Sequence, residues 1–331
     1  MVLIASVDVS RVLPFSAPKE YYLVYVFLVP ENDALLPSFS GKVVKTLLIK
    51  GNPRLEYVFE SSEVKPKPIR CSPLGYRVRG KQIYLWKRVK SGSNGEASSS
   101  FSGINVSSGG LKASDSDGIV GVTGGREYFF ILGFDETVKH LVFEAFMNID
   151  GVIAYNTRWK LTRIEVNCYP LPSMKPLVKL DGVDSVKVEF RSPVNIVDPY
   201  KPSRFRRFLP LAGFLFSYNI GEIARMDRDK REYWDLINIV SAVLQETHNL
   251  WDTVKRVYYL YDGKAIPGLT GYIKYYVAWE TLEKNPNLKL LVENVLSHAI
   301  IMGVGAGRAN GFGHVTVKLE KTSLERGHDK S

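Results

Sequence analysis

The residues best suited to chemistry lie near the C-terminus, where residues 303–313 read GVGAGRANGFG. Five glycines in one short stretch need a reason, because ordering a glycine costs backbone entropy. The usual reasons are backbone at positive φ or backbone pressed against a partner. Successive N–H groups in such a loop can bind an anion, and Arg308 adds a forked cation that matches phosphate. The alternative is a tight loop whose glycines serve only its geometry.

Two lysines and a histidine are further candidates. Lys42 and Lys45 are three residues apart in GKVVKTLLIK, residues 41–50, whose apolar spacing predicts a short helix with both lysines on one face. The free N–H groups of a helix start add to an anion site, whereas the alternative is an ordinary solvated face. His314 directly follows the glycine loop, where it is either a general acid or a structural residue.

The amino-acid composition indicates which classes of binding partner to expect. The chain has 331 residues and a net charge of +10, which suggests a polyanion, either nucleic acid or an acidic membrane. No apolar run is long enough to span a bilayer, and the N-terminus lacks a signal-peptide pattern. Neither the scattered histidines nor Cys71 and Cys168 show metal-ligand spacing. We therefore expect a cytoplasmic protein without metal or other cofactor.

The elements around the loop exclude a dinucleotide fingerprint, which needs a strand, then a glycine loop, then a helix. Here the order is reversed. Residues 286–302 have apolar residues at helical spacing, and residues 314–321 alternate as a strand does.

The first half predicts the order strand, helix, strand, strand, helix, strand, which is the ferredoxin-like pattern. The expected strands are residues 20–29, 81–89, 126–134 and 157–169, and the expected helices are 41–50 and 135–149. Residues 91–125 are rich in Ser and Gly and are expected to form a mobile insertion between two antiparallel strands. These elements define an N-terminal domain over residues 1–170.

The second half is expected to repeat this order after a linker at 171–185. Its expected elements are a strand at 186–193, a helix at 233–248, a hairpin of 254–263 and 269–279 that turns at Ala265–Gly268, the 286–302 helix and the final strand. They define a C-terminal domain over 186–322, followed by a tail at 323–331. The fold class is therefore α+β, with two tandem ferredoxin-like (RRM-like) domains and a glycine-rich loop before the last strand.

Four pieces of the chain resemble the RAMP superfamily of CRISPR-associated proteins. They are GVGAGRANGFGHV in the loop, GLTGYIKYYV at 268–277, RSPVNI at 191–196, and SGKVVKTLLIKGNP with KPIRCSPL in the first half. Within the superfamily, the chain is most similar to the repeat-RNA-processing endoribonuclease, the sixth of the numbered Cas families.

This resemblance implies metal-independent cleavage of CRISPR repeat RNA (pre-crRNA) to give guide crRNAs. A 2′-hydroxyl attacks the adjacent phosphate and leaves a 2′,3′-cyclic phosphate and a 5′-hydroxyl, which requires a base, an acid and nearby cations. Many members place a histidine on or near the first helix. In this sequence the first histidine is His140, in the second expected helix, and the first helix offers lysines instead.

The resemblance implies Lys42, Lys45 and His314 as catalytic candidates, with both lysines facing the glycine loop across a groove between the halves. The RNA-binding candidates are Arg308, Gly305, Gly307, Asn310, Gly311, Lys50, Arg204, Arg206 and Arg207. The last three belong to RFRRF, which suits RNA backbone and bases, or equally an ordinary amphipathic helix.

Two other functions remain open at this point. One is a non-catalytic RAMP subunit that binds crRNA in an effector complex, and the other is a general single-strand RNA-binding protein. Besides repeat RNA, the expected partners are other CRISPR-associated proteins and a second copy of the chain. An enzyme would cut repeat RNA alone in EDTA, whereas a subunit would bind it without cutting.

Overall fold

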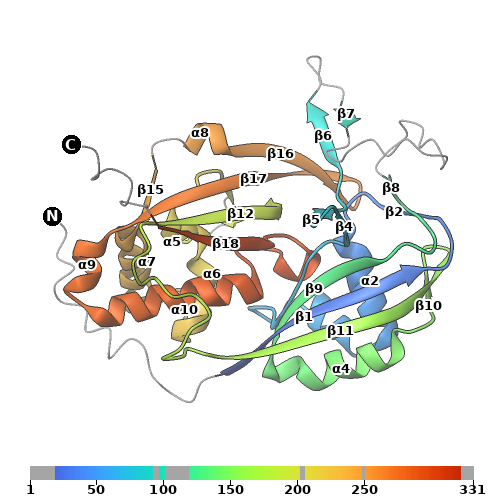
Figure 1. The fold of residues 1–331 in the computed structure, drawn as a ribbon, viewed down its shortest axis with the longest axis horizontal. Coiled ribbons are helices and arrows are strands. Elements are labelled where there is room, and N and C mark those ends of the chain that lie inside the picture. The colour runs from blue at the N-terminus through green and yellow to red at the C-terminus, as the bar shows by residue number, and fades with distance from the viewer. Residues whose placement is uncertain (1–18, 92–96, 101–118, 202–205, 248–249, 322–331) are drawn as a thin grey trace, which may run out of the picture.

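The structure, a computed structural model, describes residues 19–91, 97–100, 119–201, 206–247 and 250–321. This part of the chain forms two large antiparallel sheets, one for each half, with the main helices packed against them (Figure 1). Two short ribbons, β2–β8 and β13–β14, complete the strands.

The N-terminal sheet has the strand order β10-β11-β1-β9-β4-β5, with β3 also paired to β9. Its strands are β1 (Lys19–Pro30), β3 (Ile69–Cys71), β4 (Gly75–Val78), β5 (Lys81–Tyr84), β9 (Tyr128–Asp135), β10 (Val152–Ala154) and β11 (Thr157–Leu171). The other elements of this half are β2 (Ala34–Pro37), β8 (Ile119–Val122), α2 (Gly41–Gly51), α3 (Leu55–Glu60), the 3-10 turn η2 (Glu136–Val138) and α4 (Lys139–Asn148).

Strand β1 lies in the middle of this sheet because its aromatic and branched residues are buried on both faces. Tyr22 and Val24 pack with the apolar residues of α2 and α4. Tyr21, Leu23 and Phe27 point the other way, into a core that continues through the second half.

The C-terminal sheet has the order β18-β12-β17-β16-β6-β7, with β15 paired to β17. Its strands are β6 (Arg88–Ser91), β7 (Ala97–Ser100), β12 (Ser185–Val194), β15 (Leu244–Glu246), β16 (Val254–Tyr261), β17 (Lys264–Val277) and β18 (Val315–Glu320). The other elements are β13 (Ile196–Val197), β14 (Arg206–Arg207), α5 (Ala212–Leu215), α6 (Ser217–Ala224), α7 (Arg231–Val243), α8 (Leu250–Thr253), α9 (Trp279–Glu283), α10 (Pro286–Met302) and η3 (Arg308–Asn310).

Both halves therefore share one arrangement of their four main strands, in which the first main strand lies between the third and the fourth. In the N-terminal sheet β1 lies between β9 and β11, and in the C-terminal sheet β12 lies between β17 and β18. This is the ferredoxin-like arrangement. The predicted α+β class with two ferredoxin-like halves is confirmed.

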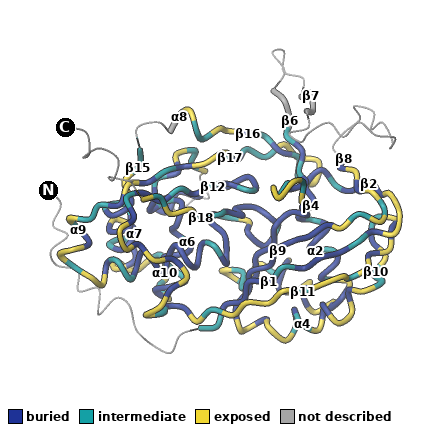
Figure 2. Tube along the Cα trace, viewed as in Figure 1, coloured by how far each residue is buried: buried dark blue, intermediate teal, exposed yellow. Residues whose placement is uncertain are grey.

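The halves are joined by packing as well as by the chain. At Gly133 of β9, an added Cβ would lie 1.9 Å from the carbonyl oxygen of Ile301 on α10, so a larger residue does not fit. Strand β6 leaves the first half and pairs with β16 of the second. Figure 2 shows the buried chain in the middle of the molecule, where β9 and β12 lie.

The second strand of the first half lies earlier than the predicted 81–89. Strands β3 and β4 pair with β9, whereas β5 pairs with β4 and β6 joins the other sheet. Prolines at 66, 68 and 73 interrupt this stretch, and proline is a poor marker of a paired strand. The expectation of one strand over 81–89 was therefore wrong.

The hairpin of the second half also turns at a different place. Its turn is Asp262–Gly263, with φ of 48° and 71°, and not Ala265–Gly268 as expected. Two residues at positive φ suit the right-handed twist of paired strands, and Asp-Gly favours that conformation. Pro267 and Gly268 instead lie within β17, opposite Tyr258 and Val257.

The Ser/Gly tract is shorter than predicted. Residues 92–96 and 101–118 of the expected insertion lie outside the described residues, as does the expected tail at 323–331. The described parts are paired, since β7 pairs with β6 and β8 pairs with β2. Val120 and Val122 are buried in the N-terminal core, so the prediction of a mobile insertion is wrong for the end of the tract.

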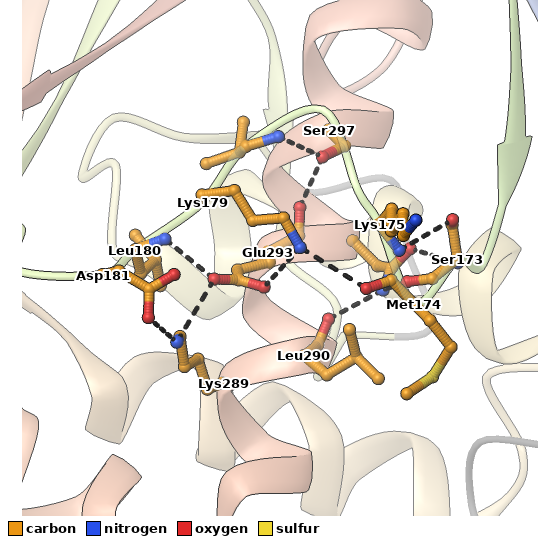
Figure 3. Close-up of polar contacts among 12 residues, drawn as sticks. Ser173, Met174, Lys175, Lys179, Leu180, Asp181, Lys289, Leu290, Glu293 and Ser297 are labelled. Carbon is orange, nitrogen blue, oxygen red and sulfur yellow. Dashed lines mark hydrogen bonds and ion pairs between the residues drawn. The ribbon is translucent and has the colours of Figure 1, made fainter.

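The predicted linker runs along α10 and is held there by polar side chains (Figure 3). Three backbone N–H groups donate to side chains of α10 at 2.7–2.9 Å, namely Ser173 to Asn294, Leu180 to Glu293 and Val178 to Ser297. These bonds satisfy donors that have no strand partner. The linker is therefore part of the folded body.

Candidate functional site

The glycine-rich loop connects α10 to β18. Both expected reasons for its glycines are present, namely backbone at positive φ and close contact with other backbone. Positive φ angles of 66° to 96° occur at Gly303, Gly305, Gly307, Gly311 and Gly313. An added Cβ would lie 2.4 Å from the carbonyl oxygen of Asn195 at Gly305, and 2.9 Å from the Cα of Gly41 at Gly311. Both obstacles are backbone atoms, so only glycine fits at these two positions.

Several N–H groups of the loop are left for a ligand. The N–H of Ala306 donates to the carbonyl oxygen of Asn195 at 2.8 Å, which fixes the loop against the C-terminal half. Within the described part of the chain, the N–H groups of Gly305 and Gly307 have no acceptor, and both residues line a large cavity. Unpaired N–H groups at positive-φ glycines suit an anion.

This cavity has a volume of 1270 Å³ and lies between the two halves. Its lining cations are Lys19, Lys65 and Lys67 from the N-terminal half, and Lys201, Arg225, Arg228 and Arg308 from the C-terminal half. Its lining carboxylates are Glu63, Asp135, Glu136, Glu222 and Asp227. Asp135 is paired with Lys19 at 2.6 Å. With seven cations against five carboxylates, the lining carries a net positive charge and suits a polyanion.

Arg308 is buried in the wall of this cavity. Its Nη2 donates to the carboxylate of Glu222 on α6, while its Nη1 is buried without a partner within the described residues. Burial alone raises the pKa of Glu222, but Arg308 and His298 outweigh burial and lower this pKa to about 2. Glu222 is therefore ionised, and it holds Arg308 by one edge.

Lys45 points from α2 toward the loop, as expected. Its side chain is 11% exposed and its Nζ lies 2.5 Å from Glu60 Oε1. The same Nζ donates to Asn310 Oδ1 at 3.4 Å and lies 5.6 Å from the ring centre of Phe59, which lines the cavity. Lys45 therefore lies between the loop and the cavity edge.

Lys42 lies one turn earlier, in a separate hollow of 390 Å³ lined by Tyr261 and Asp262. Its ammonium pairs with Asp262 at the hairpin turn, and both side chains are exposed. The hydrogen bond that Lys42 donates to Asp262 raises the pKa of Lys42, which keeps it charged. The structure thus places Lys42 and Arg308 in different hollows rather than across one groove.

The remaining expected RNA contacts are scattered. Lys50 lies at the far end of α2, where its Nζ donates to the carbonyl oxygen of Ile153 at 2.7 Å. Arg207 is paired with the buried Asp198 at 2.7 Å, whereas Arg206 is exposed on the same short strand. Arg204 lies outside the described residues.

His314 is a structural residue in this fold. It is 3% exposed, with Nδ1 2.9 Å from Arg70 Nη1 and Nε2 2.8 Å from the hydroxyl of Tyr84. Burial and the Arg70 guanidinium hold its pKa well below the usual range, so the ring is neutral. Because both nitrogens are occupied and the ring lines neither hollow, the geometry contradicts its expected role as an acid.

Sequence reasoning missed several of the residues that line the cavity. Lys67 is half-buried there, and burial together with nearby Lys45 lowers its pKa. The basic, proline-interrupted stretch that contains Lys67 was a usable signal. The sequence around Glu222 gave no such signal, because a single carboxylate in an apolar helix is usually solvated.

Two general features of the described residues bear on the site. No group of three or more His, Cys, Asp or Glu side chains among them is placed to hold a metal ion. None of the helices that the structure describes is long and apolar enough to cross a membrane.

Comparison with family models gives a match within the first half. Residues 22–107 match the family model of the Cas6 N-terminal domain, and this range begins in β1 and contains α2. A comparison with curated proteins gives no match. The similarity to the sixth Cas family that the sequence implies is therefore confirmed over these residues.

Solved structures extend the similarity to the fold of the whole chain. A Thermus thermophilus Cas6 protein is 13% identical, with a TM-score of 0.54 over 92% of this chain and 100% of that chain. The product complex of the same Cas6 protein is 14% identical, with a TM-score of 0.58 over 90% of this chain and 99% of that chain. A histidine-to-alanine mutant of another Cas6 protein is 12% identical, with a TM-score of 0.51 over 91% of this chain and 100% of that chain. At these identities the similarity shows a shared fold.

Proposed function

We propose that this protein, whose residues 22–107 match the Cas6 N-terminal domain, is an endoribonuclease that cuts CRISPR repeat RNA within the repeat. One observation carries the proposal. The glycine-rich loop presents unpaired N–H groups and a buried guanidinium to a basic cavity between the halves. Such a site matches the phosphates of a single RNA strand.

The reaction is a transesterification. The 2′-oxygen forms a bond to phosphorus while the bond from phosphorus to the 5′-oxygen breaks, which leaves a 2′,3′-cyclic phosphate and a 5′-hydroxyl. The 2′-hydroxyl proton goes to a base, and the departing 5′-oxygen takes a proton from an acid. The attacked phosphate gains negative charge, which Arg308 and the N–H groups of Gly305 and Gly307 would stabilise.

Lysines of the N-terminal half would provide the remaining chemistry. Lys45 would add positive charge beside the loop, and Lys42 would hold a neighbouring phosphate when it is released from Asp262. Lys67 is suited to donate a proton to the departing 5′-oxygen, since burial and Lys45 lower its pKa and make its ammonium a stronger acid. We propose that these cations act without a metal.

The experiment is cleavage of end-labelled repeat RNA in EDTA, with the repeat taken from the CRISPR locus that encodes the protein. Metal-independent cutting should give a 3′ fragment with a 5′-hydroxyl, which polynucleotide kinase labels directly. Acid treatment should open the cyclic phosphate of the 5′ fragment. Cutting that requires Mg²⁺, or a product with a 5′-phosphate, would refute this mechanism.

A second candidate function is a non-catalytic subunit that binds guide RNA. It is favoured by the pairing of Lys42 and Lys45 with carboxylates, and by the absence of histidine from the described residues that line the cavity. Tight binding of repeat RNA without any cleavage would support this function over the enzyme.

A further inference from the structure

The carboxylate of Glu222, whose side chain is 11% exposed, connects three elements behind the glycine-rich loop. Glu222 on α6 accepts from Arg308 through Oε1, and its Oε2 lies 3.3 Å from Nε2 of His298 on α10. The side-chain nitrogen of Asn219 lies 3.0 Å from His298 Nδ1 and donates to the carbonyl oxygen of Gly303 at 2.8 Å. The chain of contacts thus begins and ends on the loop.

The contacts determine which edge of the guanidinium is left without a hydrogen-bond partner. Glu222 occupies Nη2 of Arg308, whereas Nη1 is buried with no partner among the described residues. A buried donor without an acceptor is unfavourable, and a phosphate oxygen would remove this cost. Arg308, Gly305 and Gly307 all line the cavity, so a phosphate bound against this wall would lie near both the guanidinium and the backbone donors.

We infer that Glu222 is a positioning residue, which orients Arg308 so that its free edge meets a single phosphate of the RNA. This inference rests on the proposed function. His298 limits the movement of Glu222, and Tyr21 packs edge-on against the His298 ring with centres 4.8 Å apart. Glu222 also offsets the charge of Arg308. It therefore fixes the orientation of the guanidinium but weakens the electrostatic attraction between Arg308 and the RNA.

The two effects of Glu222 predict opposite changes in binding and cleavage. In Glu222→Gln, RNA affinity should stay the same or increase, because a negative charge has left the cavity. The single-turnover cleavage rate should fall by roughly 10–100-fold, the usual range for a residue that orients a reacting group. A merely structural role would instead weaken binding and cleavage together.

A double-mutant cycle tests whether Glu222 acts through Arg308. In the Arg308→Ala background, Glu222→Gln should change the cleavage rate no further, while thermal stability recovers because no buried charge is left unpaired. The double variant also keeps the test usable if Glu222→Gln alone folds poorly. Equal and additive losses in both backgrounds would overturn the inference.

Glu293→Gln is the matched control, because Glu293 is another carboxylate with little solvent exposure, 3%, but lies on α10 outside the cavity. It should lower thermal stability and leave cleavage by the folded protein unchanged. Wild-type behaviour of Glu222→Gln in both assays would refute the inference alone. Absence of cleavage by the wild-type protein would refute the proposed function. In that case the inference about Glu222 would still require that Glu222→Gln keeps or increases RNA affinity.

Discussion

Lys45 and Asn310 meet at 3.4 Å, Nζ to Oδ1, although 265 positions separate them in the sequence. Their contact connects the first helix of one half to the last loop of the other. Gly41 permits the approach, since an added Cβ there would lie 2.5 Å from the carbonyl oxygen of Asn310. A phosphate bound at the loop would therefore lie beside cations from both halves.

Loss of Lys45 should slow the chemical step. In Lys45→Ala, single-turnover cleavage at saturating enzyme should fall by about 10²–10³-fold, the usual cost of removing one group that stabilises a developing charge. Lys50→Ala is the control on the same helix, because Lys50 is bonded to Ile153 away from the loop, and it should cut normally. A wild-type rate for Lys45→Ala would exclude this lysine from catalysis.

RNA binding should depend strongly on salt. Each phosphate contact releases counterions, so log affinity should fall linearly with log salt concentration. In Arg308→Ala the slope should become smaller by about one unit, because one phosphate contact is lost. Fluorescence anisotropy of labelled repeat RNA at several KCl concentrations measures both slopes, and a flat plot would count against phosphate contacts altogether.

The Ser/Gly tract should divide into a dispensable part and an essential part. Replacing residues 101–118 with a short turn should leave the melting temperature nearly unchanged, because a tract of this composition forms no core of its own. By contrast, Val120→Ala should cost about 2 kcal/mol, since it removes buried methyl groups and leaves a cavity. Thermal melts of both variants test this, and a large loss in the deletion would show that the tract packs against the body.

Stability should fall in mild acid because of His314. Burial and Arg70 hold the pKa of His314 well below 6.5 in the folded protein, so the unfolded chain binds the extra proton. Its contribution is therefore complete above about pH 6.5 and is lost progressively as the pH falls below that value.

Urea titrations at pH 7.5 and 5.5 measure this loss. In His314→Gln the difference in unfolding free energy between the two pH values should be smaller than in the wild type. His140→Gln is the control, because His140 is exposed on α4. An unchanged difference in His314→Gln would mean that other groups, such as the buried His298, dominate the acid response.

Local patterns predicted the elements that frame the site. Apolar spacing gave the bounds of α10, 286–302, and the glycine density indicated positive φ in the loop. Both signals come from residues close together in the sequence. The second strand of the first half is interrupted by prolines, and the hairpin turns at Asp262–Gly263, which favours positive φ, rather than at the predicted Ala265–Gly268.

Local sequence patterns could not predict which residues contact the site residues. His314 is neutral and inaccessible because Arg70 and Tyr84, 244 and 230 positions away, occupy its ring nitrogens. Arg308 is oriented by Glu222, which lies 86 positions earlier and on another element. Such contacts depend on how the two halves pack, which no spacing rule within one segment describes.

The attachment of the linker to α10 has a consequence for synthesis on the ribosome. The linker emerges long before its partners, since Ser173 and Asn294 are 121 positions apart. Until α10 has been made, the linker donors can bond only to water, and Tyr21 and Phe27 lack the second-half side of their shared core. The nascent first half therefore leaves the ribosome with an exposed apolar face that favours aggregation. This face is covered only after the last part of the chain has been synthesised.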